Sequence, residues 1–176
     1  MSDSRRTPTL VPLLLSLLLG MAGLNQALAD SGASSGAASG STSGLASGPS
    51  SLPVVEVWKT PTCGCCGKWV RTLEKAGFKV QAHDVDSLDA IVQKHGITPA
   101  LASCHTAVVG RYVIEGHVPE SDIRRLLREK PDIKGLAAPG MPQGSPGMDV
   151  PGSPPFDVLA IGKDGKTSVY ATHPGT

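Results

Sequence analysis

Residues Lys59–Val70 have the sequence K-T-P-T-C-G-C-C-G-K-W-V and contain three of the four cysteines of the chain. Cys63 and Cys66 form a C-x-x-C pair, which is typical of thioredoxin-type redox proteins when it follows a strand and begins a helix. Cys65 has no place in that chemistry, because a dithiol that cycles with its own disulfide uses only two sulfurs. Three thiolates this close together instead favour a soft metal, namely Cu(I), Zn²⁺ or iron–sulfur, and can bridge several ions.

The residues on both sides of this stretch predict a strand followed by a helix. An apolar run precedes it, as expected of a strand buried on both faces, and consists of Val54, Val55, Val57 and Trp58. Apolar residues then recur at helical spacing until Gly77, at Cys66, Trp69, Val70 and Leu73. The cysteines therefore lie at a helix N-terminus, where the helix dipole lowers thiol pKa values and favours thiolates.

The remaining pattern predicts an α/β, thioredoxin-like fold with the element order βαβαββα. A second strand is expected from Phe78 to Ala82 and a second helix after a cap at Asp86, with Leu88, Ile91, Val92 and His95 on one face. Two further strands are expected at Thr106–Val109 and Tyr112–Glu115, and Pro119 begins a helix with Ile123, Leu126 and Leu127 inward.

The C-terminal part of the sequence predicts a long loop and a hairpin. Residues 131–155 are rich in Gly and Pro and have no helical or strand period, which is typical of a binding loop or a disordered segment. Residues 156–161 and 167–171 flank a turn at 163–166 and predict a β-hairpin that closes the domain.

The N-terminal part predicts export. Residues 1–29 combine two arginines, an apolar run and a small-x-small site at Ala27–Ala29, as in a secretory signal peptide that is removed. We assign residues 30–52 to a flexible linker rich in Ser, Gly and Ala. We assign residues 53–130 to the thioredoxin-like domain and residues 131–176 to a C-terminal extension that contains the hairpin and contributes to the metal site. We therefore expect an exported protein with no membrane anchor after cleavage. Because an exported protein lies in oxidising surroundings, two disulfides remain an alternative to a metal site.

Charge excludes some partners. The chain has 16 basic and 15 acidic side chains, and removal of the signal, with its two arginines and one aspartate, leaves them equal in number. A neutral chain has no electrostatic reason to bind nucleic acid or an anionic membrane. No sequence motif marks a catalytic triad or a phosphate-binding loop, so no catalytic or organic-cofactor residue is assigned.

Further ligands are expected outside the cysteine stretch. Cys104 begins a strand that lies antiparallel to the first strand in a thioredoxin-like sheet, which brings its thiol to the cluster. His105 is equally well explained as a ligand or as a hydrogen-bonded loop residue. His117 is a weaker candidate, and His173 is assigned to the tail. Surface and helix-end positions are assigned to His83 and His95.

Met141 and Met148 stand in the Gly/Pro-rich loop and are the only methionines outside the signal. Thioethers bind Cu(I) and cannot oxidise to disulfides, so both are candidate ligands. The alternative is that they pack the loop against the core, since methionine is a common filler of gaps.

Taken together, K-T-P-T-C-G-C-C, H-D-V-D, A-S-C-H-T-A-V-V, Y-V-I-E-G-H-V-P and G-M-P-Q-G-S-P-G-M resemble the CopG-like copper-resistance family of Gram-negative bacteria. The resemblance covers nearly all of residues 54–171. It implies a periplasmic thioredoxin-like domain in which Cys63, Cys65, Cys66 and Cys104 hold a multinuclear copper cluster, with a C-terminal extension that helps to bind metal. It also implies interconversion of Cu(I) and Cu(II), in support of a copper efflux system.

Three hypotheses remain open from the sequence. The first is a monomeric copper-binding redox protein, a candidate copper oxidoreductase, that exchanges copper with an efflux system or periplasmic carriers. The second is a metal-free thiol–disulfide oxidoreductase that uses Cys63 and Cys66. The third is a passive copper carrier. An iron–sulfur protein is disfavoured, because its cluster would have to be inserted before export.

Overall fold

The structure is a computed structural model that describes residues 52–176. The predicted signal peptide and all but the last residue of the predicted linker lie outside this range. Within residues 52–176, no helix has the length and apolar character needed to cross a membrane.

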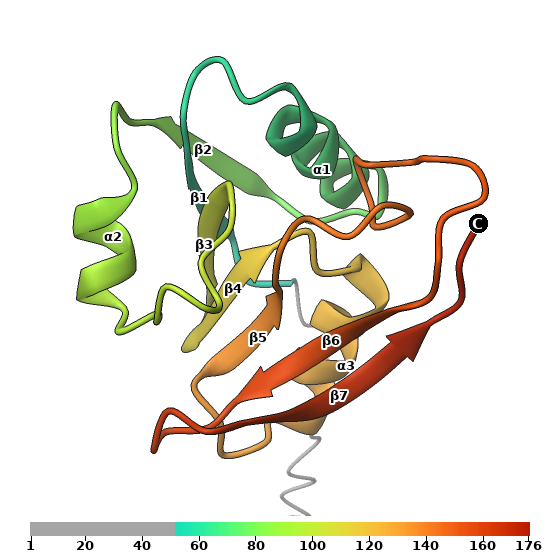
Figure 1. The fold of residues 1–176 in the computed structure, drawn as a ribbon. Helices are drawn as coiled ribbons and strands as arrows, with labels where there is room; N and C mark the ends of the chain where they lie inside the picture. The colour runs from blue at the N-terminus through green and yellow to red at the C-terminus, as the bar shows by residue number, and fades with distance from the viewer. Residues whose placement is uncertain (1–51) are drawn as a thin grey trace, which may run out of the picture. The chain divides into compact units, whose positions relative to one another are not determined.

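A single mixed sheet of seven strands, with three helices, forms the described part of the chain (Figure 1). In chain order the elements are β1 (Val55–Lys59), α1 (Gly64–Lys75), β2 (Val80–Asp84), α2 (Asp89–Lys94), β3 (His105–Val109), β4 (Tyr112–Gly116), α3 (Glu120–Glu129), β5 (Gly135–Ala138), β6 (Phe156–Ile161) and β7 (Thr167–His173). The first seven follow the predicted order βαβαββα. The strands are arranged β2-β1-β3-β4-β5-β6-β7 across the sheet.

Strand direction places the start of β3 beside the end of β1. The strands β1 and β2 are parallel, as are β4 and β5, and all other neighbours are antiparallel. In the antiparallel pair β1–β3, Lys59 lies opposite His105. The turn that follows Lys59 and leads to the cysteines therefore lies next to the segment that carries Cys104.

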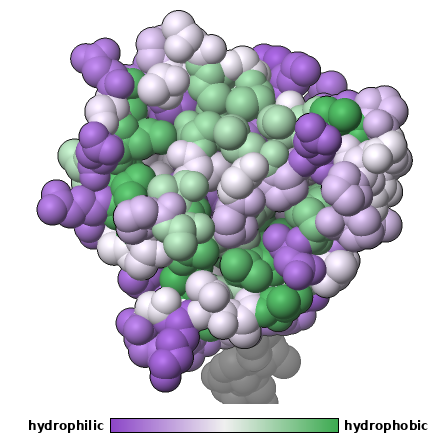
Figure 2. Space-filling view, viewed as in Figure 1, coloured by the Kyte–Doolittle hydropathy of each residue, from purple (hydrophilic) through white to green (hydrophobic). Residues whose placement is uncertain are grey.

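Alternating side chains divide the core into two layers. One layer packs α1 and α3 on the sheet, because Trp69, Leu73, Ile123 and Leu126 share an apolar cluster with the β4 residue Ile114. The other layer lies on the opposite face, where residues of and after α2 meet the other β4 side chains, and it contains Ile97, Leu101, Val113, Ala137 and Ile161, with Val92 packed against it. On the face of the molecule shown in Figure 2, hydrophilic residues project around the margin and apolar and near-neutral residues occupy much of the middle.

Several expected details of the first half are wrong. The strand β1 is buried mainly through Val55 and Val57, whereas Val54 is exposed. The expected cap of α2 at Asp86 is wrong, because the N-cap residue is Leu88 and its side chain makes no capping hydrogen bond. The strand β2 begins two residues later than predicted and is mostly exposed, since it is the edge strand and only its partner β1 covers it.

The C-terminal third differs more from the expectation. Residues 131–155 were predicted to be loop throughout, but β5 forms within them and pairs with both β4 and β6. His173 was assigned to the tail, but it ends β7 and its Nε2 lies 2.6 Å from the Asp122 carboxylate of α3. Arg125 of α3 also donates to the carbonyl of Tyr170, so two contacts attach the hairpin to this helix.

The segment after β5 returns across the molecule to α1 (Figure 1). Gly147 packs so closely on the first turn of α1 that an added Cβ would lie 2.8 Å from the Cys65 carbonyl oxygen and 2.9 Å from the Trp69 backbone nitrogen. Its backbone φ of +89° is also one that residues with side chains rarely adopt. Glycine at this position therefore allows the C-terminal segment to cover the helix that carries the cysteines.

Candidate metal centre

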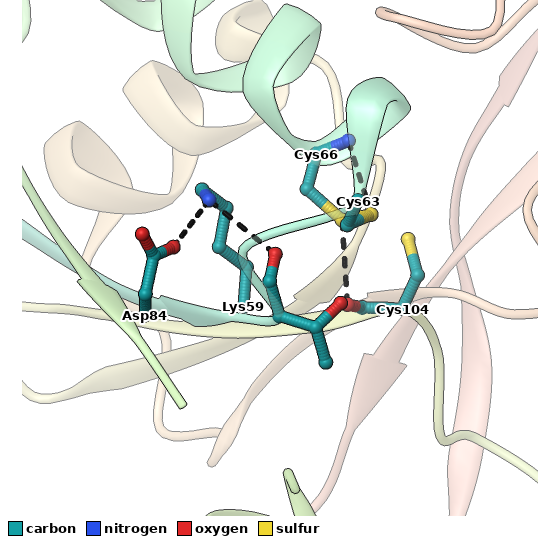
Figure 3. Close-up of polar contacts among 6 residues, drawn as sticks. Lys59, Cys63, Cys66, Asp84 and Cys104 are labelled. Carbon is teal, nitrogen blue, oxygen red and sulfur yellow. Dashed lines mark hydrogen bonds and ion pairs between the residues drawn. A yellow bond between two sulfur atoms is a disulfide. The ribbon is translucent and has the colours of Figure 1, made fainter. Parts of the chain in front are cut away.

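The first turn of α1 holds three cysteines in a fixed arrangement. Cys63 is the N-cap residue, and its sulfur accepts a hydrogen bond from the backbone N–H of Cys66 at 3.4 Å. A disulfide joins Cys63 and Cys66, whose Cα atoms are 5.4 Å apart. Figure 3 shows this disulfide at the start of the helix, with Cys104, the residue just before β3, beside it.

Cys65 and Cys104 are free thiols that extend the group of sulfurs. The Sγ of Cys65 lies 3.5 Å from that of Cys63 and 4.0 Å from that of Cys104. All four sulfurs lie within 4.8 Å of one another. Metal–thiolate bonds are about 2.3 Å long in zinc sites, so a single ion can bridge sulfurs up to roughly 4.6 Å apart. Cys65 is therefore placed to bridge the helix cysteines to Cys104.

The backbone of Cys104 also contacts the helix cysteines. The sulfur of Cys66 lies 3.3 Å from the Cys104 carbonyl oxygen (Figure 3). A disulfide sulfur carries no hydrogen, so this contact becomes a hydrogen bond only when Cys66 is reduced to a thiol. Burial, followed by the neighbouring Cys65, raises the pKa of the Cys104 thiol to about 12. In the metal-free protein Cys104 is therefore protonated, and metal binding must displace its proton.

His117 was the weaker histidine candidate, yet it makes the shorter contact with a cysteine. Its Nε2 lies 3.1 Å from the Cys104 sulfur, and its Nδ1 lies 2.8 Å from the carbonyl oxygen of Pro146. A carbonyl only accepts, so Nδ1 carries the hydrogen. Burial lowers the pKa of His117 and keeps the ring neutral. The Nε2 lone pair therefore faces Cys104, as in a histidine that ligates a metal while a backbone carbonyl orients it.

His105 lies on the same side of the sheet as α1. Its ring is fully buried, 4.4 Å from the Trp69 ring and 5.0 Å from the His117 ring between centroids. Its Nδ1 lies 3.5 Å from the Cys104 sulfur, and its Nε2 is buried with no hydrogen-bond partner. Burial, and then His117, lower its pKa to about 3. The unpaired Nε2 suits the role of a ligand, whereas the contact of Nδ1 with Cys104 suits a hydrogen-bonded residue, here at the start of β3.

Cys104, His105 and His117 form a second group of ligand atoms within 4.8 Å of one another. Cys104 belongs to both groups, so the four sulfurs and the two imidazoles form one continuous set of soft and borderline donors. Such a set suits copper or zinc and offers no carboxylate oxygen for hard cations.

Met141 and Met148 are placed differently from the cysteines. Met141 is 40% exposed at a backbone φ of +50°. Met148 is partly buried and follows Gly147, which packs on the first turn of α1. The segment of Met148 therefore lies beside the cysteine helix, whereas Met141 lies at the surface. Their role as ligands stays a prediction.

Glu115 is a buried residue of this region that the sequence reasoning missed. Its carboxylate accepts hydrogen bonds from the Ser103 backbone N–H and the Thr106 hydroxyl, both at 2.7 Å. Burial raises its pKa to about 7 despite these bonds. A signal was present in the sequence, because a lone carboxylate within the apolar strand Y-V-I-E-G needs a buried partner.

Two structures, titled "Copper resistance protein copG- Form 1" and "Copper resistance protein copG- Form 2", each match with a TM-score of 0.66 and 39% sequence identity, over 70% of this chain and 99% of theirs. The chain belongs to the CopG copper-resistance family. The predicted resemblance to CopG is thus confirmed, and CopG relatives match nearly their whole length here.

Sequence comparisons add a narrower match. A family model described as "Protein of unknown function, DUF411" matches residues 101–148, which include Cys104, both buried histidines and the segment that covers α1. No curated protein sequence matches at a significant level. The family model thus matches the part of this chain that contains Cys104 and His117, and the match does not include the C-x-C-C stretch.

Proposed function

We propose that this CopG-family protein binds copper in copper resistance and holds more than one ion on Cys63, Cys65, Cys66 and Cys104. The observation that supports this most directly is the position of Cys65, 3.5 Å from one sulfur and 4.0 Å from another. A thiol placed between two others serves a bridged metal cluster and has no function in a two-sulfur redox cycle. The titles of both CopG structures support copper as the ion.

We add His117 to the four cysteines as a proposed copper ligand. Its Nε2 lone pair faces the same space as the Cys104 thiol, and its orientation is set by Pro146. His105, Met141 and Met148 remain candidate outer or exchangeable ligands. For His105 the support is its unpaired buried Nε2, and for Met148 it is the position of its segment on α1.

The redox part of the proposal uses the Cys63–Cys66 pair. The disulfide occupies two of the four sulfurs, so it must be reduced before all four bind copper. The pair can take two electrons, one from each of two Cu(I) ions, to give two thiolates and two Cu(II) ions. The reverse reaction reforms the disulfide and returns Cu(I). The cysteine pair therefore accepts and returns the electrons that the interconversion of Cu(I) and Cu(II) requires.

The wider setting is also part of the proposal. We take residues 53–130 as a thioredoxin-like domain and 131–176 as its metal-site extension, in a monomeric protein exported to the periplasm by a signal peptide at 1–29. There it would exchange copper with an efflux system or with periplasmic carriers. The sequence pattern supports export, and membership of the CopG family supports the copper role.

The test is the copper content of residues 30–176, reduced and loaded without oxygen and then exposed to air. We expect more than one copper per chain by elemental analysis, with absorption and EPR spectra that change reversibly on oxidation. Retention of copper without any reversible change would support the passive carrier. Failure to retain copper, with disulfides formed instead, would contradict the proposal.

One observation favours a second candidate function. The Cys63–Cys66 disulfide lies at a helix N-terminus, where thiol–disulfide oxidoreductases carry their reactive pair. Such an enzyme would turn over disulfide substrates without metal. Turnover that is lost in Cys66→Ser and retained in Cys65→Ser would favour it over copper binding.

A further inference from the structure

Glu115 is a fully buried carboxyl group that neither the copper ligands nor the apolar core requires. It lies in β4 between apolar and small residues, and both of its oxygens accept hydrogen bonds from one short segment. Oε1 accepts from the Ser103 backbone N–H and Oε2 from the Thr106 hydroxyl. These two donors stand on either side of Cys104 and His105. The carboxylate therefore holds both ends of the segment that presents the Cys104 thiol.

Strand alternation places this carboxylate behind the metal centre. Glu115 pairs with Thr106 in the sheet, and it shares the α2 face with Val113, two residues earlier. His105 faces the opposite side, where it contacts Trp69 of α1. Glu115 is thus directed away from the helix that carries the other three cysteines and is not itself among the candidate ligands.

Gly116 brings the same segment close to β4. A Cβ added at Gly116 would lie 2.6 Å from the Ser103 hydroxyl oxygen and 2.9 Å from the Ala138 carbonyl oxygen. Glycine is therefore needed for Ser103 to approach near enough to bond with Glu115. Two consecutive residues of β4 thus serve to seat the segment that precedes β3.

We propose that Glu115 is the positioning residue of the metal centre, which fixes the Cys104 thiol within reach of Cys65 and His117 by holding Ser103 and Thr106. Metal sites need ligand distances within about 0.2 Å of their normal values, so a loosened Cys104 cannot complete the site. The copper part of this inference rests on the proposed function, whereas the positioning of the thiol does not.

The variants separate positioning from general destabilisation. Glu115→Leu removes both acceptors. Glu115→Gln keeps the hydrogen bonds, since its amide oxygen accepts from Ser103 and its amide nitrogen donates to the Thr106 hydroxyl. Val113→Ala is the matched control, because it removes buried volume from the same face of the same strand without touching residues 103–106.

The first readout needs no copper. With Cys65→Ser and the Cys63–Cys66 disulfide formed, Cys104 is the single free thiol of the chain. We expect Glu115→Leu to speed alkylation of Cys104 by iodoacetamide at least about tenfold, because the thiol becomes more exposed. The rates of Glu115→Gln and Val113→Ala should stay within about threefold of the parent rate. An unchanged rate in folded Glu115→Leu, or equal acceleration in Val113→Ala, would overturn the inference. If Glu115→Leu does not fold, Thr106→Val decides in its place, with an expected increase of at least about threefold.

The second readout is Cu(I) affinity in a double-mutant cycle. Glu115→Leu and Cys104→Ser should each weaken binding, and the double variant should be no weaker than Cys104→Ser alone, because both changes remove the same ligand. Additive losses would refute the positioning role even where the parent binds copper. Failure of the parent to bind copper would instead refute the proposed function. The alkylation rates would then still test the positioning role of Glu115.

Discussion

Replacement of Cys65 by serine tests the metal centre most directly. The change keeps the shape of a partly buried side chain and leaves both cysteines of the Cys63–Cys66 disulfide in place, so we expect it to cost less than about 1 kcal/mol of folding stability. It removes the sulfur that lies between Cys63 and Cys104. An ion held by α1 and an ion held by Cys104 then share no bridging ligand.

The expected loss can be scaled from known metal sites. Removing a group that only orients a ligand typically weakens metal binding 10- to 100-fold, so loss of a bridging ligand should weaken Cu(I) binding by at least about 100-fold, or roughly 2.7 kcal/mol. We also expect the copper content to fall to one ion per chain or fewer.

The assay is a Cu(I) competition titration against a chromophoric chelator without oxygen, together with elemental analysis. Gly64→Ala is the matched control, because it changes the neighbouring residue of the same helical turn and its added Cβ would meet nothing within 4 Å. Unchanged copper affinity and content in Cys65→Ser would refute the bridging role and would favour the metal-free thiol–disulfide oxidoreductase. An equal loss in Gly64→Ala would show that the helix turn, and not the thiol, is responsible.

Three further predictions concern the residues around Cys104. His117→Gln should lower Cu(I) affinity about 10-fold or more without unfolding the protein, since it removes an imidazole nitrogen that faces the thiol; equal affinity in a competition titration would contradict this. Gly147→Ala should lower the melting temperature and expose the first turn of α1 to hydrogen exchange, because its Cβ would collide with the Cys65 carbonyl; wild-type exchange there would argue against the contact. In the metal-free protein, His105 has a pKa lowered to about 3, so its contribution to stability is complete above the unfolded-state value of 6.5 and is lost as the pH falls toward 3. Glu115 opposes this between pH 7 and 4.5, because its raised pKa lets the folded state bind a proton first, whereas the lowered pKa of His117 acts in the same direction as that of His105. Denaturant titrations should therefore show that acidification over this range changes the stability of His105→Gln more favourably than that of the wild type; the same pH dependence in both would contradict this.

Much of the first half of the fold could be predicted from periodicity. Cys66, Trp69, Val70 and Leu73 recur at helical spacing, and all four are buried in α1. The expected strand topology also placed Cys104 correctly, since the antiparallel pairing of β1 and β3 brings it to the cysteines. The helical pattern of α1 is local and depends little on distant parts of the chain, whereas the placement of Cys104 followed from the element order.

The errors arose where the environment depends on distant parts of the chain. The strand β5, with the sequence G-L-A-A, has too few large apolar residues to signal a strand, and it forms because β4 and β6 supply partners on both sides. His173 resembled a tail residue because its partner Asp122 lies 51 positions away. The contact of His117 with Cys104 likewise depends on the carbonyl of Pro146, which sequence spacing alone does not reveal.

The covering of α1 by the C-terminal segment has a consequence for biosynthesis. The C-x-C-C stretch is synthesised about 80 residues before Pro146 and Gly147, which orient His117 and pack on the cysteine helix. Because synthesis begins at the N-terminus, the chain presents three thiols long before the segment that packs on their helix exists. If the protein binds copper as proposed, the complete site cannot form before the last third of the chain is made, and until then the three thiols can pair with one another.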